Sequence, residues 1–247
     1  MTKRILTLFF LFLTSTGFAQ LLTWSPDFPL ESTTGLVITA DASKGNKGLQ
    51  GYNPNDVYVH IGVITTASSS GSDWKYVKTT WPGTDPAAKA TPLGGDKWSF
   101  TITPDLRTYF GVTNPSEKIK KIAILFRSGD GNRKLANEDQ SDMYVPVYTT
   151  DLSVRFSAPP LQPTYITKPE TITKSEGDNI QLTAISNKTA TIKIYLNGTE
   201  IQSASGVTTL TANPVLDAGT QTVKAEATDG SVTTSQTFTF FVAGTVN

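Results

Sequence analysis

The residues of this chain best suited to chemistry gather around one loop. The run DVYVHIGVI at 56–64 contains the only histidine, His60, and the Ser/Gly-rich loop after it leads to Trp74 and Trp81. Successive strand residues point to opposite faces, so the apolar residues of this run share one face and His60 lies on the other. A hydrogen-bonding ring beside flat aromatic rings on an open sheet face suits a sugar, which has hydroxyl edges and apolar C–H faces.

Each aromatic residue of this region has to be weighed against simple burial. Trp98 alternates with apolar residues, which predicts a core position. Trp74 follows the Ser/Gly-rich loop between two charged residues, a pattern more typical of a loop tip, so a ligand contact is favoured. Trp81 precedes a Pro/Gly-rich turn and fits burial or a ligand platform equally well. Tyr76 and Tyr52 are secondary candidates for ligand contact.

The elements that position these side chains are expected to be strands. Short alternating runs end repeatedly at Gly, Pro, Asn or Asp, and amphipathic stretches of helix length are rare, which predicts an all-β protein. Three closely spaced prolines favour an extended linker at 157–163. We therefore expect a first domain at 21–156 and a second at 164–247.

The second domain has the pattern of an immunoglobulin-like sandwich. Its alternating runs at 192–196 and 222–227 lead into Asn-Gly and Asp-Gly turns at 197–198 and 229–230. Several short strands spaced by such turns predict an immunoglobulin-like fold, here without the cysteine pair and core tryptophan of antibody domains. The sequence of this domain offers no aromatic cluster or metal-ligand pattern, so a spacer is favoured over adhesion or partner binding.

The first 20 residues predict export. Lys3 and Arg4 precede a short apolar run at 5–13, and small residues follow before Gln20, as in a secretory signal peptide. The apolar run is shorter than the roughly 20 residues that cross a bilayer core. The sequence has no cysteine for a lipid anchor or a disulfide. We expect a secreted, periplasmic or cell-surface protein with no membrane contact after cleavage of residues 1–20.

Four segments of the first domain carry a more specific pattern. They are VYVHIG at 57–62, DW at 73–74, TPLGGDKWSF at 91–100 and IAILFRSGDG at 122–131. Together they resemble the starch-binding carbohydrate-binding modules of families 25 and 26. More closely still, they are similar to the amino-terminal module of secreted Bacteroidetes α-amylase-family enzymes, in which an Ig-like segment can follow. The likeness covers most of residues 30–150.

The resemblance implies a function and two contact residues. In the related modules the strand histidine and the loop tryptophan contact glucose, which corresponds to His60 and Trp74 here. Those families often carry a second tryptophan where this chain has NRK at 132–134, so another ring must supply the second platform. The implied function is non-catalytic binding of an α-glucan, starch or maltooligosaccharide, as the targeting part of an α-amylase-family enzyme with a downstream catalytic domain.

Other classes of function find little support. A nucleophilic triad needs a base, for which the single histidine has a simpler explanation, and no pattern pairs two carboxyl groups for glycoside hydrolysis. A catalytic barrel of about 250 residues does not fit beside two domains. The acidic loop at 130–142 could bind calcium, but Lys134 replaces an oxygen donor, so a solvated loop without metal is favoured. Zero net charge gives no reason to expect nucleic acid, and no cofactor is expected.

Two classes of function stay open. The first is α-glucan binding, in which two rings set at an angle each meet a glucose face of a curved chain. The alternative is an Ig-like structural or surface-interaction protein without glycan binding, which predicts that the first-domain aromatics are buried and that His60 packs against protein. The chain could also be the amino-terminal part of a glycoside hydrolase.

Overall fold

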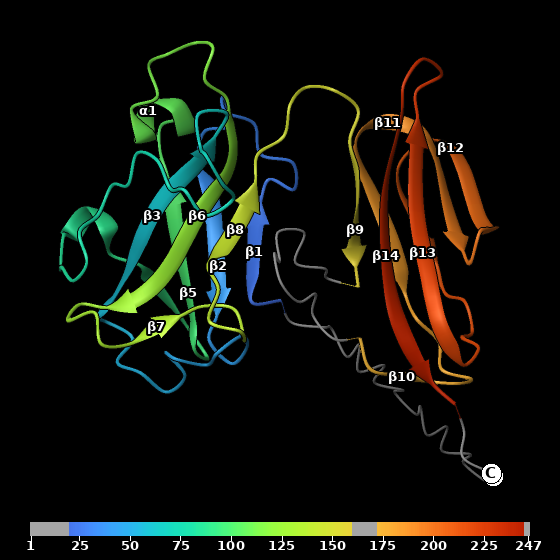
Figure 1. The fold of residues 1–247 in the computed structure, drawn as a ribbon, viewed down its shortest axis with the longest axis horizontal. Coiled ribbons are helices and arrows are strands. Elements are labelled where there is room, and N and C mark those ends of the chain that lie inside the picture. The colour runs from blue at the N-terminus through green and yellow to red at the C-terminus, as the bar shows by residue number, and fades with distance from the viewer. Residues whose placement is uncertain (1–19, 160–171, 245–247) are drawn as a thin grey trace, which may run out of the picture.

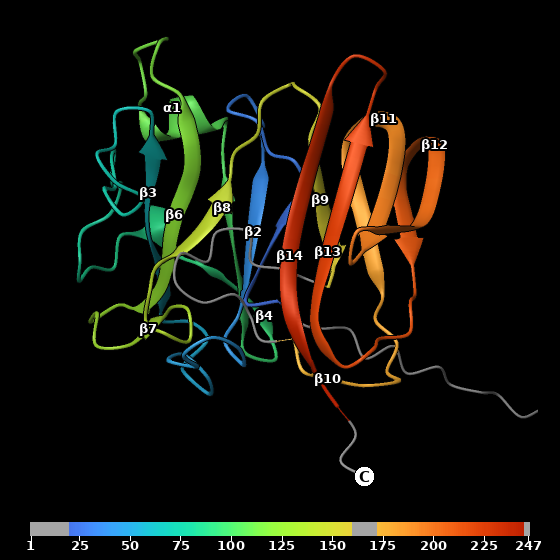
Figure 2. The same ribbon diagram turned by 45° about the vertical axis from the view of Figure 1, so that its right-hand side comes forward.

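The computed structural model describes residues 20–159 and 172–244 and is built almost wholly of strands (Figures 1 and 2). In this part of the chain the only helices are the 3-10 turn η1 (Pro86–Ala88) and the short α1 (Leu106–Phe110). No described helix is long and apolar enough to span a bilayer. The buried side chains form two main clusters, one in each domain. The predicted all-β fold of two sandwich domains is confirmed; the predicted signal peptide lies outside the described residues, except for Gln20.

The first domain stacks two sheets against each other (Figure 1). One sheet has the order β1-β2-β5-β4, with β1 (Leu22–Ser25), β2 (Leu36–Asp41), β5 (Lys97–Ile102) and β4 (Thr91–Gly94). The other contains β3 (Val57–Thr65), β6 (Ile119–Ser128), β7 (Lys134–Leu135) and β8 (Met143–Pro146). In this second sheet β3 pairs along its length with β6, and β7 and β8 pair with opposite ends of β6. β3 is therefore an edge strand.

Alternation along the strands fills the space between these two sheets. Ile38 and Trp98 of one sheet and Ile61 and Ile124 of the other are buried in one cluster. Trp98 is 1% exposed, and its indole N–H donates to the carbonyl of Pro54 at 3.0 Å. A buried indole needs such a partner for its one polar atom. The prediction that Trp98 belongs to the core is confirmed.

The second domain is a sandwich whose two layers share bent strands. They are β9 (Val154–Ala158), β10 (Lys174–Ser175), β11 (Leu182–Leu196), β12 (Thr199–Ala212), β13 (Gly219–Thr228) and β14 (Thr233–Ala243). The first half of β11 pairs with β9 and the end of β12, and its second half pairs with β13 and the start of β12. Register shifts between Ile185 and Ile192 mark the crossing. β14 and, in parallel, β10 complete the second layer. This pairing is that of an immunoglobulin-like sandwich.

Strand β9 packs with the second domain, although the sequence analysis assigns most of it to the first. Val154 and Phe156 are buried in the second cluster, whose first member is Leu152. Val147 is the last residue packed on the first cluster. The chain therefore passes from the first core to the second between Val147 and Leu152, before β9 and before Pro159, which follows that strand. Most of the predicted linker at 157–163 lies outside the described residues.

Arg155 of β9 reaches back to the first domain. Its side chain is almost fully buried, and Nη2 donates to the carboxylate of Asp27. The guanidinium carbon lies 5.4 Å from the ring centre of Trp24 and 5.5 Å from that of Phe28. The junction between the domains thus contains a buried cation held by one carboxylate and two aromatic rings.

Candidate functional site

The candidate site is built on the outer face of the β3–β6 pair, turned away from the core. The register places His60 opposite Leu125 and Tyr58 opposite Arg127. The alternate residues of β3 lie in the core cluster, whereas His60 is only half-buried and lies outside that cluster. The predicted outward orientation of His60 is confirmed. The question is what covers this face.

Residues 66–84 return along the free edge of β3 and cover part of the face. The backbones of Val63 and Lys75 exchange two hydrogen bonds of 2.9 and 2.8 Å. Gly62 leaves room for the covering segment, since a β-carbon there would lie 3.0 Å from the Lys75 carbonyl oxygen and 3.3 Å from the Trp74 ring. The face predicted to be open is therefore partly closed, because an edge strand with unpaired backbone groups accepts a further segment.

Three of the predicted residues come together here, and we call them the ring cluster: His60, Trp74 and Trp81. The ring centres of His60 and Trp74 are 5.5 Å apart with planes 26° from parallel, which is a stacked pair. Those of His60 and Trp81 are 5.4 Å apart at 88°, which is an edge contact. Both spacings fall in the attractive range for aromatic pairs. The two indoles are steeply inclined to each other, with the imidazole between them.

Trp74 is anchored rather than free. Its indole Nε1 donates to Asp142 Oδ2 at 3.0 Å. Its ring packs on a small cluster on the outer face formed by Ile64, Ala123 and Tyr144, and it also contacts the first core cluster. The sequence predicts an exposed loop tip, but the structure makes Trp74 half-buried, because the segment that carries it lies against the sheet.

Trp81 is held by a residue that the sequence analysis does not identify. Arg127 is 1% exposed, and its guanidinium donates to the carbonyls of Gly83 and Thr80 at 2.7 and 2.9 Å. Its Cζ lies 5.2 Å from the centre of the Trp81 ring. Trp81 itself remains 39% exposed. The pattern that could have revealed this role is an arginine directly after the apolar run at 122–126.

The environment of His60 keeps its ring neutral near pH 7. Burial lowers the pKa of His60 below its ordinary value of 6.5, and the charge of Arg127 lowers it further, while Asp142 acts in the opposite sense. Nδ1 shares a hydrogen bond of 3.0 Å with Thr79 Oγ1. Within residues 20–159 and 172–244 no hydrogen bond engages Nε2. One ring nitrogen therefore fixes the imidazole, and the other is available for a ligand hydroxyl.

The two tyrosines predicted as secondary candidates lie apart from the ring cluster. The hydroxyl of Tyr76 donates to Glu117 Oε2 at 2.7 Å. The hydroxyl of Tyr52 donates to Asp56, and the guanidinium of Arg133 lies 5.2 Å from its ring centre. Among the described residues no ring contact joins either tyrosine to the ring cluster. Both hydroxyls are engaged within the protein.

Two carboxylates of the acidic loop at 130–142 bind the loop's own backbone, whereas Asp142 binds the Trp74 indole. Asp130 accepts the backbone N–H of Asn132 at 3.0 Å, and Asp139 accepts that of Ser141 at 3.0 Å. No three histidine, cysteine, aspartate or glutamate side chains converge as a metal-binding group in the described parts of the chain. Asp130 and Asp139 therefore act as turn caps.

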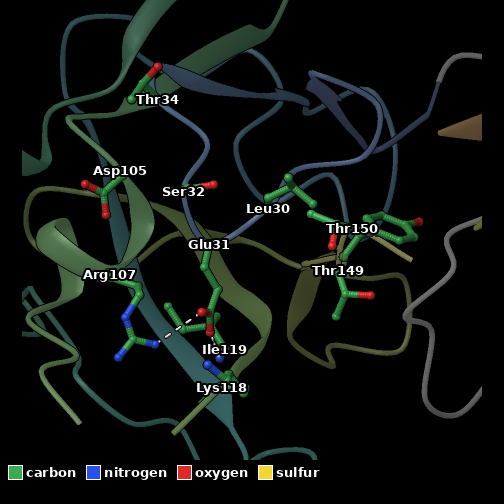
Figure 3. Close-up of a pocket in the computed structure, with 11 residues that line it drawn as sticks. Leu30, Glu31, Ser32, Thr34, Asp105, Arg107, Lys118, Ile119, Thr149 and Thr150 are labelled. Carbon is green, nitrogen blue, oxygen red and sulfur yellow. Dashed lines mark hydrogen bonds and ion pairs between the residues drawn. The ribbon is translucent and has the colours of Figure 1, made fainter. Parts of the chain in front are cut away.

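Two surface cavities lie away from the ring cluster. The larger, of about 640 Å³, lies beside α1 and the start of β6 (Figure 3). There Arg107 pairs with Glu31 at 3.2 Å and also donates to the Glu117 carbonyl at 2.8 Å, while Glu31 accepts the backbone N–H of Ile119. The second, of about 530 Å³, lies at the junction of the domains. The Arg107–Glu31 ion pair that lines the larger cavity serves the fold, since both side chains also hold the backbone at the start of β6.

Comparisons with known proteins show no family. No family model and no curated protein matches the chain. Among solved structures it is similar to fibronectin(III)-like modules of Clostridium thermocellum CbhA, at 16% identity over 37% of this chain and 98% of that one, with a TM-score of 0.30. It is similar to the titin Z1Z2 domains in complex with telethonin at 14% identity over 92% of this chain and 98% of that one, with a TM-score of 0.27. The titin Ig tandem A164-A165 is 9% identical over 88% of this chain and 92% of its own length, with a TM-score of 0.28. Scores this low carry no argument, so the fold assignment rests on the strand pairing.

Proposed function

We propose that this chain binds an α-glucan, starch or a maltooligosaccharide, at the ring cluster and performs no chemistry on it. The observation that carries the proposal is the half-buried His60 between two steeply inclined indoles, one of them 39% exposed. An α-1,4-glucan curves, so neighbouring glucose units present their faces at an angle that suits inclined rings. A flat β-1,4-glucan suits a coplanar row of rings instead.

We expect weak binding, which is useful only when the binding module is linked to an enzyme. One stacked ring removes roughly 40 to 50 Å² of apolar surface from water, which is worth about 1 kcal/mol. One or two rings and a hydrogen bond from His60 Nε2 supply about 2 to 3 kcal/mol, less than the roughly 5.5 kcal/mol of a Kd on the order of 0.1 mM, so we expect a Kd of that order or weaker. Such a module raises the effective concentration of a linked enzyme at its substrate. This fits the resemblance to the amino-terminal module of secreted α-amylase-family enzymes.

A second candidate is an Ig-like structural or surface-interaction protein without glycan binding. Two observations favour it. The second domain has immunoglobulin-like strand pairing. In addition, the Trp74 N–H is hydrogen-bonded to Asp142 and part of the ring packs on the outer-face cluster. Under this view the ring cluster is a small core that fastens residues 66–84 to the sheet.

Calorimetry on the full chain with maltoheptaose and with cellohexaose separates these functions. The glucan proposal expects heat of binding with maltoheptaose and none with cellohexaose. Equal binding, or binding of cellohexaose alone, contradicts the α-glucan assignment. Binding of neither oligosaccharide favours the interaction protein. Trp81→Ala should lower maltoheptaose binding, while the matched change Leu93→Ala, at a residue 55% exposed and outside the ring cluster, should not.

A further inference from the structure

We infer that Arg127 is the positioning residue of this site: its buried guanidinium fixes the turn at 80–83 and, through that turn, the plane of Trp81. The inference rests on the proposed function for what Trp81 does with a glucan. How Trp81 is held follows from the geometry alone and can be tested without any ligand.

Among the described residues, Arg127 is the only one whose side chain links the 80–83 turn to β6 by hydrogen bonds. Nη2 donates to the Thr80 carbonyl at 2.9 Å, and Nη1 donates to the carbonyls of Gly83 and Ser128 at 2.7 and 2.9 Å. The two turn carbonyls lie on either side of Trp81 in the sequence. Because a guanidinium is planar and its donors have fixed directions, binding both carbonyls sets the position of the peptide units between them.

The charge of Arg127 has no carboxylate partner within ion-pair distance among the described residues. Its Nε is buried without a hydrogen bond. What surrounds the cation is a set of carbonyl oxygens and two ring faces, Trp81 at 5.2 Å and Tyr58 at 5.9 Å from Cζ. A buried unpaired cation is costly, and a well-packed apolar residue commonly serves a fold as well or better. This arginine binds the carbonyls of the 80–83 turn, and an apolar residue in its place would make no such contact.

The surroundings of the turn leave the indole one orientation. The Gly83 N–H donates to the Gly129 carbonyl at 3.1 Å, which closes the turn against the end of β6. A β-carbon on Gly131 would lie 2.9 Å from Nε1 of Trp81, so the indole edge sits directly against that backbone. Arg127 covers the ring at 5.2 Å, and His60 makes an edge contact with it. The exposed part of Trp81 thus faces solvent at a fixed angle to Trp74.

Arginine and lysine are not equivalent in this position. A lysine keeps the charge, but a single ammonium cannot bind both turn carbonyls and lie flat on an indole. We expect Arg127→Lys to leave the sheet intact and release the turn. Maltoheptaose binding should weaken about tenfold, the value of one ordered aromatic contact. In a Trp81→Ala background the same change should have no further effect on binding.

The test uses the full chain labelled with 5-fluorotryptophan, which gives one fluorine NMR resonance for each of the four tryptophans. Trp81→Phe assigns the Trp81 resonance. Arg127→Lys should shift or broaden that resonance and leave Trp98 unchanged. The matched control is Arg155→Lys, since Arg155 is also buried with an unpaired Nε and lies 5.4 Å from the Trp24 ring. It should move the Trp24 resonance and leave Trp81 and maltoheptaose binding unchanged.

The outcomes separate this inference from the proposed function. A Trp81 resonance that is the same in Arg127→Lys and the unmodified chain overturns the positioning role, whatever happens to binding. A resonance that moves while binding holds keeps the positioning role and removes Trp81 from the glucan site. If Arg127→Lys does not fold, nitrogen NMR of the unmodified arginine side chains decides instead. Separate, slowly exchanging Nη resonances for Arg127 are expected, and averaged ones like those of exposed Arg133 overturn the inference.

Discussion

The two domains share a sandwich architecture but use the outer faces of their sheets differently. In the second domain β13 alternates buried residues such as Val223 and Ala225 with polar ones that face solvent, and Lys224 pairs with Glu226 at 2.9 Å. In the first domain the outer face of β3 and β6 carries His60 and is partly covered by residues 66–84. The outer face of β13 needs no covering segment, because its threonine, lysine and glutamate side chains are solvated.

The covered face also concentrates the unusual chemistry of the molecule. It holds a half-buried imidazole, a buried unpaired guanidinium and two indoles within one layer of side chains. Of these groups only Trp74 packs against the apolar first core, and it does so from the outer side, where it also contacts the outer-face cluster. The difference between the domains teaches that a sandwich can carry a second layer of packed aromatic and charged side chains on the outer face of one sheet. The predictions below compare that layer with the two cores.

The largest effect is expected from the core of the first domain. Trp98→Ala should lower the free energy of unfolding by roughly 3 to 5 kcal/mol, because a fully buried indole leaves a large cavity. Chemical denaturation measures this, with Phe241→Ala as control, since Phe241 is 66% exposed and its loss should cost no more than about 0.5 kcal/mol. A small loss for Trp98→Ala would contradict its core position.

The matching change in the second core tests to which domain β9 belongs. Phe156 is 1% exposed in the second cluster, and its backbone N–H is bonded to the Gln236 side chain. Phe156→Ala should cost about 3 kcal/mol. The loss should appear in the unfolding of the second domain, followed by hydrogen exchange along β11, and leave maltoheptaose binding intact. Loss of protection in β3 instead would place β9 with the first core.

The sequence predicts those features that depend on alternation or on local turn residues. Trp98 in the core and the outward phase of His60 follow from period-two patterns, and the turns of the second domain follow from their Asn-Gly and Asp-Gly pairs. The cover over β3 does not, because no alternation marks the Ser/Gly-rich segment 66–84 as one that turns back onto the free edge of β3. The same holds for Arg127, whose role depends on where the 80–83 turn lies, and for β9, whose partner β11 follows the linker.

A smaller effect on stability, with a large one on binding, is expected at the ring cluster. Trp74→Ala should abolish retention on starch and cost about 1 to 2 kcal/mol of stability, since the ring is half-buried and its N–H is bonded to Asp142. Starch retention and thermal unfolding of the same samples measure both. Tyr76→Phe is the control: it removes the bond to Glu117 outside the ring cluster and should retain binding. A loss comparable to that of Trp98→Ala would show that Trp74 belongs to the core.

The smallest expected effect is a pH dependence of stability that differs between the two domains. The pKa of His60 lies below its ordinary value of 6.5 because burial and Arg127 disfavour the charged ring, so the unfolded chain binds the proton more readily than the folded chain. The stability of the first domain should therefore be complete above pH 6.5 and fall as the pH is lowered from there through the folded pKa. Carboxylates such as Asp73 and Asp229, whose pKa values lie at about 2, lose their contributions only at lower pH.

His60 is the only histidine of the chain, so the second domain should show no such slope between pH 7 and 5.5. His60→Gln keeps a hydrogen-bonding side chain without the titration and should remove the slope from the first domain. Urea unfolding at several pH values, read out by hydrogen exchange in β6 and in β13, separates the two domains. An equal slope in both, or one that survives in His60→Gln, would show that another group titrates. Stability that rises on acidification would show that the folded protein favours the charged imidazole, which would make the ring cluster a cation site rather than a neutral surface for a sugar.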